Sequence, residues 1–144
     1  MNALSVCMVS AGGFFLLGLV CGAWKYLHIR RSAETRAPIY VDLAHRSALM
    51  YAFANILLSR FVERSRWSEP VNLTAVIVLQ IFFASAVLAY AVHGALGDTD
   101  NQFRRPHRLG RATIPDAAMT AFMMALIGAE VAAFAVVFAG YQTR

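Results

Sequence analysis

Four long apolar stretches, separated by short polar segments, dominate the sequence. They cover approximately residues 4–27, 40–63, 71–94 and 116–141. Each holds at least about 20 residues, which is enough for a helix to cross a hydrocarbon core of about 30 Å. Helices are expected because lipid offers no hydrogen-bond partner to backbone N–H and C=O groups. The pattern predicts an all-α fold, in which residues 1–144 form a single integral membrane four-helix bundle with short loops.

The second apolar stretch carries more polar side chains than the other three. Its hydrogen-bonding groups recur every four residues, at Ser47, Tyr51, Asn55 and Ser59, and therefore lie along one face of a helix. Such a face should turn toward protein in a membrane, so we expect the other helices to pack around this one. Bonding between helices is the simplest interpretation, and a face that lines a ligand site is the alternative.

Small residues form two patterns typical of close helix packing. Gly18 and Gly22 lie four residues apart in the first stretch, where they let another backbone approach. The fourth stretch has a small residue at every third or fourth position: Ala118, Ala121, Ala125, Gly128, Ala132, Ala135 and Ala139. This stripe predicts a close seam with another helix, belonging either to the same chain or to another subunit.

Glu130 is an ionisable residue near the middle of the fourth stretch. Its insertion costs at least about 2.5 kcal/mol, which makes it a candidate functional residue. Asn55 and Gln80 fall at a similar depth, so we expect one of them to hydrogen-bond Glu130, together with Tyr51. Desolvation favours the protonated carboxyl group. A neutral acid that ties helices together is the simplest interpretation; a proton-handling or ligand-binding acid and a contact to another subunit are the alternatives.

The composition supports a membrane protein. Hydrophobic residues make up 59% of the 144 residues and charged residues only 15%, whereas a soluble domain carries about 25% charged residues. The net charge of +5 comes almost entirely from arginine, since Lys25 is the only lysine. These charges lie near helix ends, where anionic lipid headgroups explain them better than nucleic acid does. The preference for arginine and alanine is typical of a bacterial source.

The distribution of basic residues predicts the orientation. Lys25, Arg30 and Arg31 end the first stretch, and the long loop 96–115 adds four arginines. The opposite side carries Arg60, Arg64, Arg66 and Arg144. The positive-inside rule therefore favours both termini on the outer side of a plasma membrane and both longer loops in the cytoplasm. Glycines and prolines in the long loop predict that it lacks regular structure.

All four histidines should lie on the cytoplasmic side, which raises the question of a cofactor. A b-type haem requires axial histidines that face each other on two helices, and His45 and His93 are the candidate pair. A zinc or iron site would need further ligands, of which Asp42 is the nearest. Histidines that bond to headgroups, loops or a partner are the simpler interpretation, so we expect no cofactor and no metal.

The size, the four spans and the basic cytoplasmic face resemble the membrane-associated eicosanoid and glutathione enzymes (the MAPEG family). In that family an Arg-x-x-x-Asn-x-x-Glu type motif on the second helix holds glutathione. Here Arg46 is followed by Met50 and Phe53 at those positions. The resemblance is therefore one of topology, without the glutathione motif.

These patterns favour a non-catalytic subunit or accessory factor of a larger membrane protein complex over an enzyme. The expected partners are membrane lipids and other membrane subunits or further copies of the chain, and nucleic acid is not expected. A small membrane enzyme or redox protein, with His45, His93 and Arg46 at the mouth of its site, is the first alternative. A binder of lipid or another hydrophobic ligand is the second.

Overall fold

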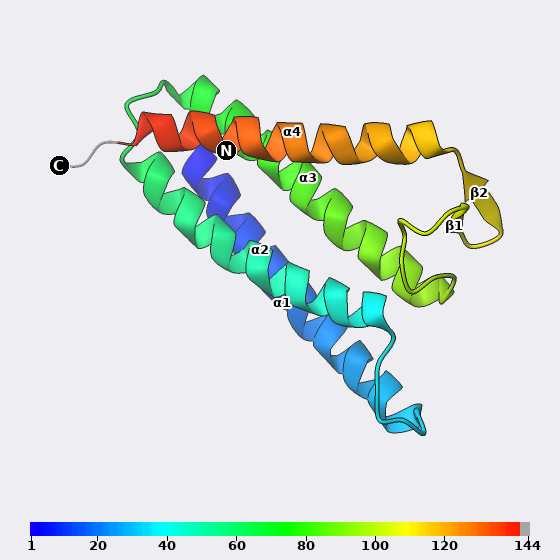
Figure 1. The fold of residues 1–144 in the computed structure, drawn as a ribbon. Coiled ribbons are helices and arrows are strands. Elements are labelled where there is room, and N and C mark those ends of the chain that lie inside the picture. Colours follow the sequence, from blue (N-terminus) through cyan, green and yellow to red (C-terminus); the bar gives the residue numbers. More distant parts are fainter. Residues whose placement is uncertain (142–144) are drawn as a thin grey trace.

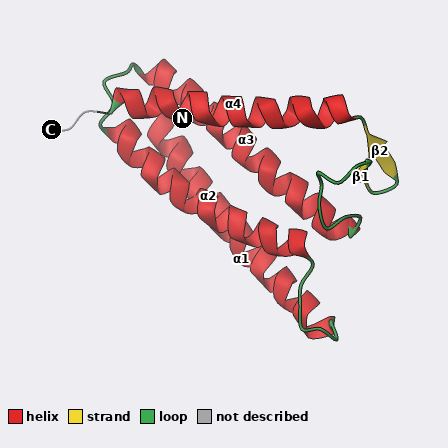
Figure 2. Ribbon diagram, in the orientation of Figure 1, coloured by secondary structure: helices red, strands yellow, loops and turns green. Residues whose placement is uncertain are grey.

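The computed structural model describes residues 1–141, which contain four helices and one small hairpin (Figures 1 and 2). Helix α1 spans Ala3–Arg31, α2 spans Ile39–Glu63, α3 spans Glu69–Leu96 and α4 spans Asp116–Gly140. The four predicted stretches match these helices, and α1 continues about one turn further than expected. The all-α class is therefore confirmed. Arg144, used in the charge comparison above, lies outside the described residues.

Three of these helices, α1, α3 and α4, are long and apolar enough to cross a membrane. Helix α2 has 25 residues, which at about 1.5 Å per residue also suffices for a hydrocarbon core of about 30 Å. It is less apolar than the other three because its polar face and charged ends lower its hydropathy. The membrane character of the chain thus rests on three candidate spans.

Helices α2 and α3 together form the centre of the fold, because each of them contacts the other three helices. The core contains small residues of α2, such as Ala48 and Ala52, packed against larger ones, such as Val76 and Leu79 of α3. Gly94 lies near the C-terminal end of α3, where the backbone of α3 passes close to the start of α2. A Cβ added there would lie 3.0 Å from the backbone nitrogen of Val41, so only glycine lets these backbones come so near.

The helices alternate in direction. The start of α1, the link between α2 and α3, and the end of α4 all lie at one end of the molecule (Figure 1). Hydrogen bonds join these segments: the N–H of Arg66 donates to Gly140 O at 2.9 Å, and Trp67 Nε1–H donates to Val136 O at 2.9 Å. The longer loops lie at the opposite end.

Helix α4 is attached to the rest of the molecule mainly through its C-terminal half. Its buried residues are Ala133, Val137 and Gly140. Toward its N-terminus α4 diverges from α1 and α2, as Figure 1 shows. This divergence leaves much of its surface uncovered by the chain.

The long loop contains regular structure, so the prediction that it lacks any is wrong. Strand β1, His107–Leu109, pairs antiparallel with β2, Ala112–Ile114. Gly110 turns the chain between them with a φ of +59°, a conformation that favours glycine. Three-residue strands are too short to leave a periodic pattern in the sequence, and this hairpin depends on contacts with residues before it.

Candidate functional site

A polar layer lies between α2 and α3, at the depth expected from the sequence. Asn55 is fully buried, and its Nδ2–H donates to the carbonyl oxygen of Tyr51 at 2.9 Å. Gln80 Nε2–H in turn donates to Asn55 Oδ1 at 2.8 Å. This pair joins two neighbouring helices and satisfies both groups of the Asn55 amide.

Glu130 does not join this layer, so the expected hydrogen bond to Asn55 or Gln80 is wrong. Its Oε1 atom is buried without a hydrogen-bond partner, and so is Gln80 Oε1. The amides of Asn55 and Gln80 bond to each other because α2 and α3 are in direct contact. The Oε1 atom of Glu130, on α4, therefore lies inside the bundle without a hydrogen-bond partner.

Two other members of the polar face of α2 make contacts inside the bundle. The ring of Tyr51 stacks on Phe83 with 4.1 Å between centroids and tilts against Phe14 at 5.9 Å. Ser59 Oγ–H donates to the carbonyl oxygen of Ile56 at 2.7 Å. Tyr51 and Asn55 therefore pack α2 against its neighbours, whereas the bond of Ser59 stays within α2.

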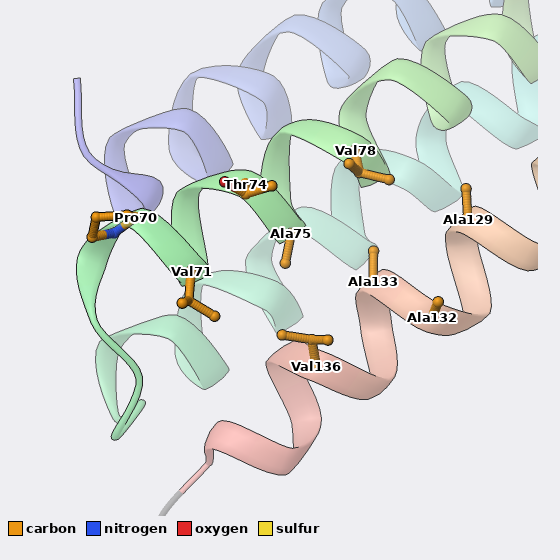
Figure 3. Close-up of a pocket in the computed structure, with 9 residues that line it drawn as sticks. All are labelled: Pro70, Val71, Thr74, Ala75, Val78, Ala129, Ala132, Ala133 and Val136. Atoms are coloured by element: carbon orange, nitrogen blue, oxygen red, sulfur yellow. The ribbon is translucent and has the colours of Figure 1, made fainter.

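Two apolar cavities flank α4 on either side of Ala133. One, of about 540 Å³, lies between α3 and α4; Figure 3 shows residues of the two helices facing each other across it, with Thr74 contributing the only side-chain oxygen among the residues drawn. The other, of about 280 Å³, lies between α2, α3 and α4 and is lined by Glu130 together with Ala54, Leu57, Leu58, Leu79, Phe83, Val131 and Phe134.

The small-residue stripe of α4 is not packed against another helix of the described chain, although one member, Ala132, borders the cavity between α3 and α4. All seven members, Ala118, Ala121, Ala125, Gly128, Ala132, Ala135 and Ala139, are exposed. A Cβ added at Gly128 would meet nothing within 4 Å. A seam between this stripe and a helix of the same chain is therefore not formed in the described residues.

Gly18 and Gly22 pack against α2, within the same chain. A Cβ at Gly18 would lie 2.5 Å from Leu49 Cδ2, and one at Gly22 would lie 2.9 Å from His45 Cε1. His45 Nδ1–H donates to the carbonyl oxygen of Gly18 at 2.7 Å. The pair thus lets a histidine of α2 insert against the backbone of α1.

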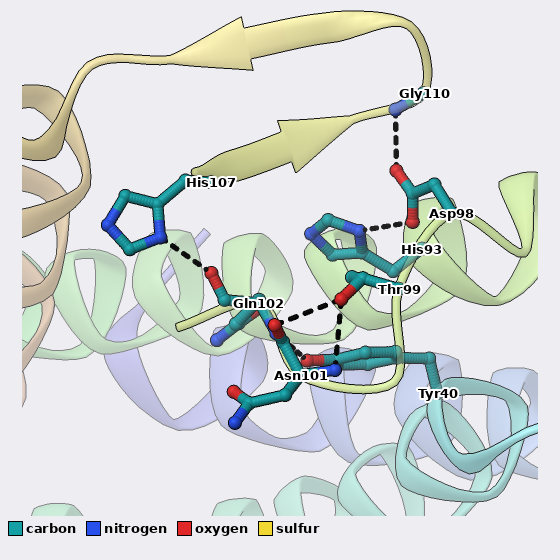
Figure 4. A network of polar contacts seen from close by, with 8 residues as sticks. All are labelled: Tyr40, His93, Asp98, Thr99, Asn101, Gln102, His107 and Gly110. Carbon is teal, nitrogen blue, oxygen red and sulfur yellow. Dashed lines mark hydrogen bonds and ion pairs between the residues drawn. The ribbon is translucent and has the colours of Figure 1, made fainter. Parts of the chain in front are cut away.

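A network of polar contacts fixes the long loop to the ends of α2 and α3 (Figure 4). His93 Nδ1–H donates to Asp98 Oδ1 at 2.8 Å, and both side chains are 5% exposed. The other carboxylate oxygen of Asp98 accepts the N–H of Gly110 at the turn of the hairpin. Burial of Asp98 opposes its ionisation, but the bonds from Gly110 and His93 outweigh burial and hold the pKa of Asp98 below its ordinary value.

Tyr40 closes the same network from the start of α2. Its hydroxyl oxygen accepts the N–H of Gln102, and its ring lies 5.0 Å from that of His93. An Asp–His pair can accept a proton, but catalysis also needs a nucleophile or a second acid placed against it. The bonds of Tyr40 and Asp98 go to loop backbone, so the network is best explained as the anchor of the loop.

The two candidate haem ligands hydrogen-bond to different parts of the chain. The Nδ1 atom of His45 bonds to α1, whereas that of His93 bonds to the loop after α3. Among residues 1–141 there is no group of three or more His, Cys, Asp or Glu side chains that could hold a metal ion. Asp42, the other candidate ligand, pairs with Lys25 and Arg46 instead.

Sequence reasoning missed several of these contacts. The network partners Tyr40 and Gln102 are 62 residues apart, and neither lies in a recognisable motif. The ion pair between Lys25 and Asp42 joins α1 to α2, whereas from the sequence we considered Asp42 as a metal ligand. The sequence did contain a signal for this ion pair. The first apolar stretch ends in basic residues, and the second begins with an acidic one.

The positions that correspond to the glutathione motif of the MAPEG family point outward. Met50 is 70% exposed and Phe53 is 67% exposed, and Arg46 is exposed beside Asp42. Comparison of the chain with protein-family models, curated proteins and solved structures finds no match. The function must therefore be argued from the chain itself.

Proposed function

We propose that this chain is a multi-pass protein of a bacterial plasma membrane that acts as a non-catalytic subunit or accessory factor of a larger membrane protein complex. The supporting observation is the stripe of small residues on α4, which is exposed along its whole length. The alternative membrane enzyme is less well supported, because the polar groups near His93 hold the loop.

The chemistry of helix association in lipid explains why this stripe matters. Lipid tails are as apolar as leucine, so exposed hydrophobic side chains alone do not drive helices together. Small residues do, because they allow close backbone contact. The bundle uses the opposite side of α4, at Ala133 and Val137, and the open space beside Gly128 leaves room for the backbone of a second helix.

The proposed orientation places α2 across the membrane as the fourth span. Its polar side chains Asn55 and Tyr51 are covered by α1 and α3, which makes a less apolar helix tolerable in lipid. Both termini lie on the outer side. The arginine-rich loops lie in the cytoplasm, where they meet anionic headgroups.

The experiment is purification of the tagged full-length protein at native expression in a gentle detergent, followed by mass spectrometry of the proteins that accompany it. We expect stoichiometric co-purification of other membrane proteins. The substitution Gly128→Leu places a large side chain on the stripe, at a position where an added Cβ would meet nothing within 4 Å. This variant should therefore keep its thermal stability and lose the partners.

The matched control is Ile127→Phe, which adds bulk at a position that is 48% exposed but lies on a different side of α4. It should retain the partners. A wild-type protein that purifies alone, or only as copies of itself, would contradict the proposal. Equal loss of partners in both variants would place the interface away from the stripe.

A further inference from the structure

The cavity beside Glu130 combines an apolar wall with one unpaired acid. Its volume is about 280 Å³, whereas a single water needs only roughly 10–15 Å³ of such space. Every lining residue except Glu130 is apolar, so no basic or hydrogen-bonding side chain of the lining neutralises the carboxyl group. The cavity is large enough for the head and part of the body of a small amphiphile.

The unpaired polar atoms at this depth are both acceptors. Glu130 Oε1 and Gln80 Oε1 are buried without a hydrogen-bond partner. Gln80 directly follows the lining residue Leu79 on α3, and its amide nitrogen is already used by Asn55. An unmade hydrogen bond in an apolar environment is costly, and a ligand that carries an N–H or O–H donor would satisfy the free Oε1 atom of Glu130.

The charge of the acid and the aromatic rings of the lining indicate which chemical class of donor fits the cavity. An ionised carboxylate inside a membrane is stabilised by a cation, and an ammonium group offers three N–H donors as well as the charge. The rings of Phe83 and Phe134 line the same cavity, and aromatic faces attract cations. An ammonium head therefore matches the acid, the free acceptors and the rings together.

The cavity is reached from the lipid. Val131 and Leu57, which line it, are 65% and 52% exposed on the outer surface of the bundle. A ligand dissolved in the membrane can thus enter between α2 and α4 without crossing the protein. This access favours a ligand with an apolar body.

We propose that this cavity binds a lipophilic primary amine, whose protonated head donates to Glu130 and whose apolar body lies between α2 and α4. In the unliganded protein the carboxyl group is protonated. The amine enters from the lipid in its neutral form and accepts this proton, which leaves a Glu130 carboxylate paired with an ammonium head. The site is independent of the stripe of small residues, which lies on a different side of α4.

The experiment uses the full-length protein in phosphatidylcholine nanodiscs and dodecylamine as the probe. Infrared difference spectra between wild type and Glu130→Gln identify the C=O band of the protonated acid. Dodecylamine should remove this band and raise the Tm of the wild type. The affinity of the Glu130→Gln variant should be lower by at least about tenfold, because a buried charge pair has lost one partner.

Four controls separate this site from general effects of the amphiphile. Dodecanol tests the apolar body without the charge, and dodecyltrimethylammonium tests the charge without N–H donors; neither should remove the band. Ala54→Phe fills the cavity while keeping Glu130, and should abolish the response. Glu63→Gln, at an exposed carboxylate of α2, should respond as the wild type does.

Two results would overturn the proposal. One is a protonated-acid band that saturating dodecylamine leaves unchanged. Glu130 would then either bond to a side chain of a partner protein or have a purely structural role. The other is an equal response to dodecylamine and to dodecyltrimethylammonium, which would reflect surface potential rather than a site with N–H recognition.

Discussion

Asp98 links parts of the chain that lie apart in the sequence. Its two carboxylate oxygens accept hydrogen bonds from the ring of His93, at the end of α3, and from the backbone of Gly110, in the hairpin. Both acceptor atoms belong to one side chain that is 5% exposed. Loss of this carboxylate should free the hairpin from the helix.

The lowered pKa of Asp98 predicts how this link depends on pH. An aspartate has an unfolded pKa of about 3.9, and the bonds from Gly110 and His93 depress the folded value. The stabilisation is therefore fully present above the unfolded pKa and is lost as the pH falls through the lower folded one. We expect Asp98→Asn to lower the Tm at neutral pH, and the difference from wild type to shrink below about pH 4.

The measurement is the Tm of the two purified proteins in detergent across this range of pH. Asp100→Asn is the control, because Asp100 is 67% exposed and pairs with Arg104 on the surface. It should change the Tm little, since exposed ion pairs contribute about 0–1 kcal/mol. Parallel pH profiles for wild type and Asp98→Asn would contradict the assignment.

The residue scale also shows where sequence reasoning ends. Depth along a helix could be counted from the apolar stretches, and it grouped Asn55 with Gln80, which hydrogen-bond to each other. It also grouped with them Glu130, whose Oε1 atom has no hydrogen-bond partner. Which residues bond depends on the distance between helices and on their rotation. Helices α2 and α3 are close enough to pair their amides, whereas the acid of α4 faces a cavity.

At the scale of elements, α4 depends on contacts near its end. Trp67, in the link between α2 and α3, donates its indole N–H to Val136 O. Gly140 makes room for it, because a Cβ there would collide with the indole ring. A single aromatic residue outside the helices thus positions the last helix.

Substitution of Trp67→Phe tests this anchor, because phenylalanine keeps an aromatic ring and removes the N–H donor. We expect a loss of stability of about 1 kcal/mol, the net value of one hydrogen bond, and faster hydrogen exchange in the last turns of α4. Tyr26→Phe, at a side chain that is 58% exposed, should change neither. Unchanged exchange in α4 after Trp67→Phe would show that packing alone holds the helix.

Helices and hairpin differ in how far the sequence determines them. Each helix consists of a long apolar run that begins and ends at prolines, charges or glycine, so its bounds could be predicted within a few residues. The hairpin of β1 and β2 has no such pattern. It is held by Asp98 and by the bond from His107 to Gln102 O, which only the folded chain brings together.

At the scale of the whole molecule, the alternating helices place the chain ends and loops on two opposite sides. The start of α1 and the link at Trp67 lie at one end, and the segments at residues 32–38 and 97–115 lie at the other (Figure 1). If α2 crosses the membrane with the other helices, these two sides face different compartments. From the charge distribution we propose that the first of these sides faces the outside.

Cysteine labelling of intact cells tests this orientation. We expect a membrane-impermeant maleimide to label Ser68→Cys and Asn2→Cys, and to label Arg36→Cys and Leu109→Cys only after the membrane is opened. The native Cys7 and Cys21 are 0% and 4% exposed, so the wild-type protein should remain unlabelled as the control. Labelling of Arg36→Cys in intact cells would reverse the orientation.

The meeting of the start of α1 and the end of α4 near Trp67 has a consequence for biosynthesis. A ribosome makes α1 well before α4, and yet Gly140 bonds to Arg66 beside the region where Ala3 bonds to Glu69. Helices α1 to α3 can pair while α4 is still being synthesised. The cavity beside Glu130 is lined by residues of α4, so it can form only after this helix has joined the other three.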